Sequence, residues 1–201
     1  MTRLLMVRHG ETELNSSIRY WGRSDVKLSA QGLSQAERLR DRMVMENIDA
    51  IYSSNLVRAR VTAEIIASEH QLKVESCPEI AEINFGDLEG LTFDEIKSSY
   101  PEVAKKWMVR SPEFEYPGGE SREGFNQRVA GFLPRLENHG AKENLLIVAH
   151  SGVLRTLICQ ILKMPIDLRW QLRIDLASLS IMETYQSTAI LTLLNDVSHL
   201  R

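Results

Sequence analysis

The stretch LLMVRHGETELN, residues 4–15, places four apolar residues directly before two basic side chains, Arg8 and His9, and then a glycine. A short continuous apolar run is typical of a strand that is buried on both faces of a parallel sheet. Adjacent arginine and histidine side chains have no use in a packed core, whereas a bound anion accepts hydrogen bonds from both. The stretch therefore predicts a buried strand that ends at an anion-binding site.

Segments with strand character alternate with segments of helix character along the rest of the chain. Ser29, Ser54 and Ser121 are placed to cap helices, and the helix after Ser54 is expected to bury Val57, Val61, Ile65 and Ile66. The predicted strands are 4–7, 50–54, 72–78 and 144–150, followed by a hairpin over 178–194. The predicted helices are 29–46, the segment after Ser54, 121–136, 152–162, and two short ones within 92–110 that Pro101 separates.

This alternation implies an α/β fold. We expect a three-layer α/β/α sandwich with a mostly parallel central sheet, in a single domain over residues 1–201. In open sheets of this type, ligands bind beside the carboxyl ends of the strands. The residues that directly follow each predicted strand are therefore the candidates for a functional site.

Composition narrows the class of protein. The 201 residues include 24 Lys and Arg against 27 Asp and Glu, a formal charge of -3, which argues against nucleic acid as a partner. Cys77 and Cys159 lie far apart and match no metal or redox spacing. The apolar run after the N-terminus is too short for a signal peptide, and no run is long enough to span a membrane. We expect a cytoplasmic protein without a membrane partner or a bound metal.

The ends of three predicted strands carry groups that suit phosphate. Arg8 and His9 follow the first strand, Arg58 lies one helical turn beyond the second, and His150 ends the strand at 144–150. Arginine binds phosphoryl oxygens with paired donors, and helix N-termini near Asn55 and Gly152 would add backbone N–H groups. A neutral imidazole can also attack phosphorus and carry the phosphoryl group. Because arginines can offset the charge, this chemistry needs no metal or other cofactor.

Such a reaction needs a proton donor for the leaving alcohol, and a carboxylic acid is the usual choice. The stretch EIAEINFGDLEG, residues 79–90, supplies the carboxyl groups of Glu79, Glu82, Asp87 and Glu89. Composition alone cannot choose among them.

Five motifs, in this order, resemble the histidine phosphatase superfamily, which includes cofactor-dependent phosphoglycerate mutases. They are RHGETELN (8–15), SNLVRARVTAEII (54–66), EINFGDLEG (82–90), PGGES (117–121) and AHSGVLR (149–155). The resemblance implies that His9 is the phosphorylated nucleophile, that Arg8, Arg58 and His150 complete the phosphate pocket, and that Glu82 is the general acid. It also implies phosphate or substrate contacts at Asn15, Gly22 and Ser151.

The resemblance is strongest to the branch with α-ribazole-5′-phosphate phosphatases, although Leu88 stands where that branch often has Trp. It implies a phosphomonoesterase that acts on a small-molecule phosphate ester, with α-ribazole 5′-phosphate or a small sugar phosphate as the favoured substrate. A phosphoglycerate mutase and a non-catalytic module that binds phosphate ligands remain the alternatives. The oligomeric state, monomer or homodimer, stays open.

Two features argue against the mutase. His150 is followed by Ser151 where mutases read Gly, and the segment between Glu82 and Gly118 is short. Its cations, Lys97, Lys105, Lys106 and Arg110, alternate with apolar residues and are expected to face solvent. We therefore expect a pocket that is open to water. Trp21, Trp107 and Trp170 are assigned to packing, with Trp21 beside the pocket loop.

Overall fold

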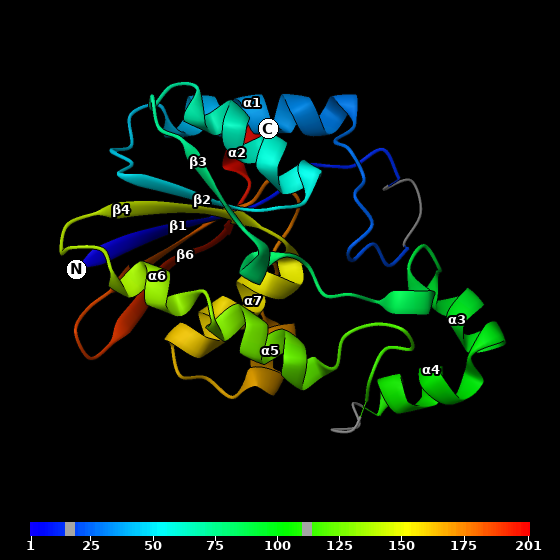
Figure 1. The fold of residues 1–201 in the computed structure, drawn as a ribbon. Coiled ribbons are helices and arrows are strands. Elements are labelled where there is room, and N and C mark those ends of the chain that lie inside the picture. Colours follow the sequence, from blue (N-terminus) through cyan, green and yellow to red (C-terminus); the bar gives the residue numbers. More distant parts are fainter. Residues whose placement is uncertain (15–18, 110–113) are drawn as a thin grey trace.

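The computed structural model describes residues 1–14, 19–109 and 114–201. Within these residues a six-stranded sheet runs through the centre of the molecule in the order β3-β2-β4-β1-β5-β6 (Figure 1). The pairs β1–β4, β2–β4 and β2–β3 are parallel, whereas β5 is antiparallel to both β1 and β6. The mostly parallel sheet is thus confirmed. The strands are β1 Thr2–Arg8, β2 Ala50–Ser54, β3 Val74–Cys77, β4 Asn144–Ala149, β5 Leu179–Thr184 and β6 Ala189–Asp196.

Helices cover both faces of this sheet, as the predicted three-layer sandwich requires. One face carries α1 (Ala30–Met43) and α2 (Val57–Ala67). The other face carries α5 (Arg122–Ala130), α6 (Leu133–Glu137) and α7 (Ser151–Ile161). The short helices α3 (Phe93–Ser99) and α4 (Pro101–Met108) stand beside the sheet, at the side toward which β1 runs (Figure 1).

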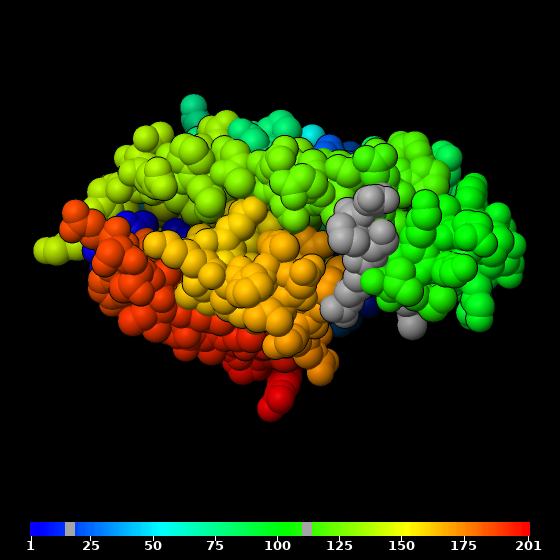
Figure 2. Space-filling view, turned by 90° about the horizontal axis from the view of Figure 1, so that it is seen from below, coloured from blue at the N-terminus to red at the C-terminus, as the bar shows by residue number. Residues whose placement is uncertain are grey.

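The central strand β1 shows why its sequence is apolar without interruption. Leu4 and Met6 join the cluster under α5 and α7, whereas Leu5 and Val7 join the cluster under α1 and α2. Successive side chains of a strand point to opposite faces, so a strand covered on both faces needs apolar residues at every position. Seen from below in Figure 2, α5 to α7 and the segment after them cover this face of the sheet, with the β5–β6 hairpin along one side.

The second predicted helix begins later and buries a different face than expected. Ser54 does not cap it: α2 starts at Val57 after Leu56, and the Ser54 hydroxyl instead accepts from the Leu56 N–H at 3.2 Å. Of the four expected core residues only Ile66 is buried. The side chains that α2 buries are Arg58, Ala59, Thr62, Ala63, Ile66 and Ala67. Small alanines let α2 lie close to the sheet, and the buried arginine serves the site described below.

The helix expected over 121–136 is broken. Ser121 does cap α5, since its hydroxyl accepts from the Gly124 N–H at 3.0 Å, but α5 ends at Ala130. A second helix, α6, starts at Leu133 with Pro134 in its first turn. Proline lacks the N–H that a helix interior needs and clashes with the preceding turn, so it marks a new start.

Ser29 caps α1, and the 92–110 helices and the terminal hairpin are confirmed within a few residues. Among the described residues no helix is both long and apolar enough to cross a membrane.

Candidate active site

The carboxyl ends of the parallel strands open onto a cavity of about 280 Å³. Arg8 and His9 at the end of β1, Arg58 in the first turn of α2, Glu82 after β3, and Ser151 at the start of α7 all line it. His150, at the end of β4, lies directly behind, with its ring centroid 5.0 Å from that of His9. The fold thus brings together six residues that the sequence analysis had assigned to one site.

His9 is held in one tautomer. Its side chain is buried, with 6% exposed, and Nδ1 donates to the Gly10 carbonyl oxygen at 2.7 Å. Because a carbonyl oxygen can only accept, Nδ1 carries the ring proton and Nε2 keeps its lone pair in the neutral ring. Burial, with the charges of Arg58 and Arg8, holds the pKa of His9 well below its usual 6.5. The ring is therefore neutral at physiological pH, as a nucleophile must be.

Two guanidinium groups flank this ring. Arg58 is 2% exposed and donates to the carbonyl oxygens of Ser24 at 2.8 Å and Gly22 at 2.7 Å. Arg8 donates to the Ile174 carbonyl oxygen at 2.8 Å, and its buried Nε has no hydrogen-bond partner among the described residues. Burial lowers the pKa of Arg8 to about 10, so it remains charged at neutral pH. Backbone carbonyls orient both cations without neutralising them, which leaves their charge available to an anion.

His150 is fully buried and is also neutral, because burial and the charge of Arg58 hold its pKa well below 6.5. The Ser54 hydroxyl lies 2.8 Å from its Nε2, while Nδ1 is buried without a partner among residues 1–14, 19–109 and 114–201. Ser54 already accepts from the Leu56 N–H, so its own proton can go to Nε2. The His150 Nδ1 then carries a proton that it can donate to an anion.

The structure separates the four carboxyl groups of residues 79–90, which composition could not. Glu82 alone among them lines the cavity. It is 8% exposed, and its oxygens accept from the N–H groups of Ile83 at 3.0 Å and Gly152 at 3.1 Å. Glu79 pairs instead with Arg135 at 3.0 Å. Glu89 accepts from the backbone N–H groups of the 23–24 loop at 2.5 and 2.7 Å, and Asp87 packs against Gly118.

The three assigned substrate contacts differ in outcome. Ser151 lines the cavity at the start of α7. Gly22 does not line it but presents its carbonyl oxygen to Arg58, and a Cβ there would lie 2.1 Å from the Ile83 carbonyl oxygen. Its role is thus to let the loop approach residue 83 closely while orienting Arg58. Asn15 lies outside the described residues.

The sequence analysis missed most of the aromatic side chains that line the cavity. Trp21, Trp107 and Trp170, which were assigned to packing, all line the cavity. Other aromatic and cationic side chains that line it are Tyr20, Phe85, Tyr116, Phe125, Arg19, Arg155 and Arg169. The signals for this were the position of Trp21 beside the pocket loop and the places of Phe85 and Arg155 inside two of the quoted motifs, EINFGDLEG and AHSGVLR; the other lining residues named here lie outside the five motifs.

The segment between Glu82 and Gly118 contributes to this wall. Lys97, Lys105 and Lys106 are exposed as expected, and Arg110 lies outside the described residues. Trp107, however, reaches the cavity from α4, where it stacks on Phe85 with centroids 6.1 Å apart. The short segment therefore supplies one side chain of the cavity lining, which the sequence analysis did not anticipate. In the described part of the chain no group of three His, Cys, Asp or Glu side chains could hold a metal ion.

Comparisons with known proteins agree with this geometry. Residues 4–197 match the family model of the histidine phosphatase superfamily, branch 1. Phosphoserine phosphatase 1 of Hydrogenobacter thermophilus is 33% identical over 100% of this chain and 95% of its own. Adenosylcobalamin/alpha-ribazole phosphatase of Escherichia coli is 34% identical over 96% of both chains. The crystal structure of a putative alpha-ribazole-5′-P phosphatase from Escherichia coli, 33% identical, superposes with a TM-score of 0.92 over 97% of this chain and 96% of that one. The chain belongs to branch 1 of the histidine phosphatase superfamily and is a phosphatase.

Proposed function

We propose that this phosphatase, as one catalytic domain, hydrolyses small organic phosphate monoesters through a phosphohistidine at Nε2 of His9. The observation that carries the proposal is the hydrogen bond from His9 Nδ1 to the Gly10 carbonyl oxygen. It leaves an unprotonated ring nitrogen beside the charged guanidinium groups of Arg58, which is buried, and Arg8, which is partly exposed, and attack on a phosphoryl group needs both features.

In the first step, Nε2 of His9 forms a bond to phosphorus as the bond from phosphorus to the ester oxygen breaks. Arg8, Arg58 and Nδ1 of His150 bind the phosphoryl oxygens, with the Ser151 N–H at the start of α7 and Asn15 as further contacts. Glu82 transfers a proton to the leaving oxygen, so the alcohol departs neutral. The imidazole then carries the phosphoryl group on Nε2 and its original proton on Nδ1.

In the second step, water attacks the phosphorus of the phosphoenzyme. The Glu82 carboxylate takes a proton from this water. The bond between phosphorus and Nε2 breaks, and its electron pair returns to the ring. Inorganic phosphate leaves, His9 is again neutral, and Glu82 again holds the proton that it needs for the next ester.

The first candidate substrate is α-ribazole 5′-phosphate, an aromatic base on a ribose phosphate. Two of the similar proteins are named for this activity. The observation that favours it here is the aromatic wall, in which Trp21, Trp107, Trp170, Phe85 and Tyr116 face the cavity that holds His9. Aromatic side chains stack well on a flat heterocyclic base, which a simple sugar phosphate lacks.

A second candidate is a carboxylated ester such as phosphoserine, the substrate named for another relative. It is favoured by Arg155 and Arg169, which line the cavity with their guanidinium carbons 5.7 and 5.3 Å from the Trp170 ring centroid. Neither forms an ion pair with a carboxylate of the described residues. Two cations beyond those at His9 would suit a second acidic group on the leaving alcohol.

The test is a panel of esters with a trapped intermediate. Purified enzyme is incubated with α-ribazole 5′-phosphate, phosphoserine, 3-phosphoglycerate or p-nitrophenyl phosphate, and free phosphate is measured. A parallel reaction is quenched in alkali, which preserves phosphohistidine. We expect turnover with EDTA present, an acid-labile phosphate on the wild-type protein, and neither in His9→Ala. Full activity in His9→Ala would end the proposal.

The same panel separates the alternatives. A mutase must shield its phosphoenzyme from water until an acceptor oxygen arrives, so it would interconvert 3- and 2-phosphoglycerate faster than it releases phosphate. We expect phosphate release and negligible exchange, even after priming with 2,3-bisphosphoglycerate. A binding module would retain phosphate esters without turnover, and it would have no use for the acid Glu82. A preference for phosphoserine over the ribazole ester would keep the chemistry and change only the substrate.

A further inference from the structure

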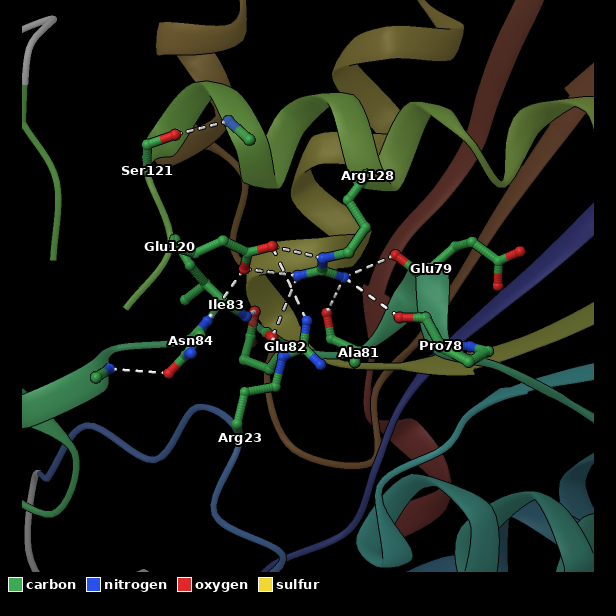
Figure 3. A network of polar contacts seen from close by, with 12 residues as sticks. Arg23, Pro78, Glu79, Ala81, Glu82, Ile83, Asn84, Glu120, Ser121 and Arg128 are labelled. Atoms are coloured by element: carbon green, nitrogen blue, oxygen red, sulfur yellow. Dashed lines mark hydrogen bonds and ion pairs between the residues drawn. The ribbon is translucent and has the colours of Figure 1, made fainter. Parts of the chain in front are cut away.

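The backbone that carries Glu82 is held by an arginine that does not line the cavity. We call residues 78–82, which follow β3, the acid turn. Arg128 of α5 reaches this turn with its guanidinium group (Figure 3). One terminal nitrogen donates to the carbonyl oxygens of Glu79 and Ala81, each at 2.8 Å, and the other lies 3.4 Å from that of Glu82. The first of these nitrogens also lies 3.5 Å from the Pro78 carbonyl oxygen, so a single side chain gathers four carbonyl oxygens of the acid turn around one charge.

These carbonyls need such a partner. The acid turn includes a single turn of 3-10 helix, Pro78–Ile80. The ladder between β2 and β3 ends at Cys77, and in the part of the chain that the structure describes the acid turn pairs with no strand. Its backbone oxygens therefore lack ladder partners, and unpaired buried carbonyls are costly. Arginine is the side chain with enough donors in a rigid fork to serve several at once.

Glu120 fixes the direction of the Arg128 guanidinium. Its carboxylate accepts from Nε of Arg128 at 2.6 Å and from a terminal nitrogen at 2.9 Å, a bidentate pair. Glu120 also accepts from the Asn84 N–H at 3.2 Å, just beyond the acid turn. From the opposite side, Arg23 donates to the Glu82 carbonyl oxygen at 2.9 Å. Figure 3 shows these contacts converging on the backbone of Glu82.

The side-chain carboxyl group of Glu82 needs this support because it makes few contacts of its own. Among the residues that the structure describes, its oxygens accept from two N–H groups, those of Ile83 and Gly152, and hydrogen-bond to no cation. A proton donor works only when it lies within hydrogen-bond reach of the leaving oxygen. A backbone shift of the acid turn would carry Glu82 away from that position while leaving His9, Arg8 and Arg58 in place.

We propose that Arg128, held by Glu120, is the positioning residue for proton donation by Glu82. The proposal rests on the proposed phosphohistidine mechanism and deepens it: Arg128 touches neither substrate nor reacting atoms and acts through the backbone of the acid turn. Its loss slows the departure of alcohols that need a proton and spares those that leave as stable anions.

Arg135 supplies a matched control. It also contacts the acid turn, but through the Glu79 carboxylate, with which it pairs at 3.0 Å, and it pairs with Glu75 of β3 at 2.5 Å. Among the described residues it donates to no carbonyl oxygen of the turn. Removing Arg135 therefore costs an ion pair at the same place without freeing the backbone of Glu82.

The experiment compares Arg128→Met with Arg135→Met and Glu82→Gln on a primary alkyl phosphate and on p-nitrophenyl phosphate. We expect Arg128→Met to lower kcat/KM, which reports only the formation of the phosphoenzyme, about 10- to 100-fold for the alkyl phosphate, less than the full contribution of a general acid, and to change kcat/KM for p-nitrophenyl phosphate little. Arg135→Met should leave the ratio of the two rates unchanged. Arg128→Met added to Glu82→Gln should cause no further loss, since both remove the same function.

Equal losses on both substrates, or additive losses in the double variant, would overturn the proposal and make Arg128 a residue of general stability. If Arg128→Met does not fold, Glu120→Gln tests the same point with the arginine present, and it should show the same dependence on the leaving group at reduced size. The proposed function fails differently: there the wild type would yield no phosphohistidine, and Glu82→Gln itself would not discriminate between the two esters.

Discussion

The carboxylate of Glu82 accepts the N–H of Gly152 at 3.1 Å, and a Cβ at position 152 would lie 2.4 Å from a Glu82 oxygen. The first turn of α7 can therefore meet this carboxyl group only because residue 152 has no side chain. The contact places Glu82 at a helix N-terminus, on the same side of the sheet as His9.

Gly152→Ala should separate stability from catalysis. Alanine favours a helix over glycine by about 1 kcal/mol, yet here its methyl group must push Glu82 aside. We expect an unchanged or slightly raised melting temperature, together with a loss of about tenfold or more in kcat for alkyl phosphates. Wild-type rates on alkyl esters would show that the carboxyl group does not need this position.

Glu82→Gln should reveal the proton donor through the leaving group. The amide fills the same space but has no acidic proton. The kcat/KM for an alkyl phosphate, which reports only the formation of the phosphoenzyme, should fall by about 10²- to 10⁴-fold, whereas that for p-nitrophenyl phosphate, whose phenolate leaves unaided, should be far less affected. Glu89→Gln is the comparison variant: since Glu89 holds the 23–24 loop whose Ser24 carbonyl orients Arg58, it should affect both esters alike.

Arg58→Lys should weaken the phosphate pocket without removing a charge. A lysine ammonium cannot reach both the Gly22 and Ser24 carbonyls and also offer a planar pair of donors to an anion. We expect the inhibition constant for vanadate to rise about tenfold or more. Arg60→Lys serves as the control, because Arg60 is exposed and pairs with Glu64 one turn away at 2.8 Å. Unchanged vanadate inhibition would place Arg58 outside the pocket.

The two buried histidines should make the fold sensitive to acid. The pKa values of His9 and His150 lie well below 6.5 in the folded protein, chiefly because of burial. In the unfolded chain both titrate near 6.5, so below that pH the unfolded state binds more protons. Their stabilisation is complete above pH 6.5 and is lost as pH falls toward the folded pKa values, by up to about 1.4 kcal/mol per pH unit for each histidine.

Urea unfolding at pH 7.5, 6.5 and 5.5 measures this slope. In His150→Gln, whose new side chain does not titrate, the slope of the free energy of unfolding against pH should decrease by the contribution of one histidine. Saturating vanadate should raise the free energy of unfolding at each pH, since it binds only the folded state. A slope that is the same in wild type and variant would show that His150 is protonated within the fold.

The phosphate-binding half of the site was predictable because it follows a rule of topology. Arg8, His9 and His150 directly follow buried apolar runs, and parallel strands deliver their carboxyl ends to one edge of the sheet. Glu82 needed the family resemblance, since its selection over Glu79 and Glu89 depends on the path of the acid turn and not on any local pattern.

The aromatic side chains that line the rest of the cavity were not predictable, for a physical reason. Trp107 and Trp170 come from α4 and from the segment after α7, and their approach to His9 depends on long-range packing. At the level of sequence, an aromatic residue that lines a cavity looks the same as one in a core. The prediction of which face α2 buries was wrong for a related reason. Arg58 is buried, although it is charged, because the Gly22 and Ser24 carbonyls of the site bind its guanidinium group.

The position of β1 between β4 and β5 determines the stage of folding at which the active site forms. His9 directly follows β1, and both strands that pair with β1 lie far from it along the chain, at residues 144–149 and 179–184. The Ala177 N–H donates to the His9 carbonyl oxygen at 3.1 Å, and Arg8 donates to the carbonyl oxygen of Ile174. His9 and Arg8 therefore reach their final positions only after the segment before β5 has packed against the end of β1. Pairings between segments this far apart in the sequence form slowly, so we expect phosphatase activity to return with the slowest phase of refolding.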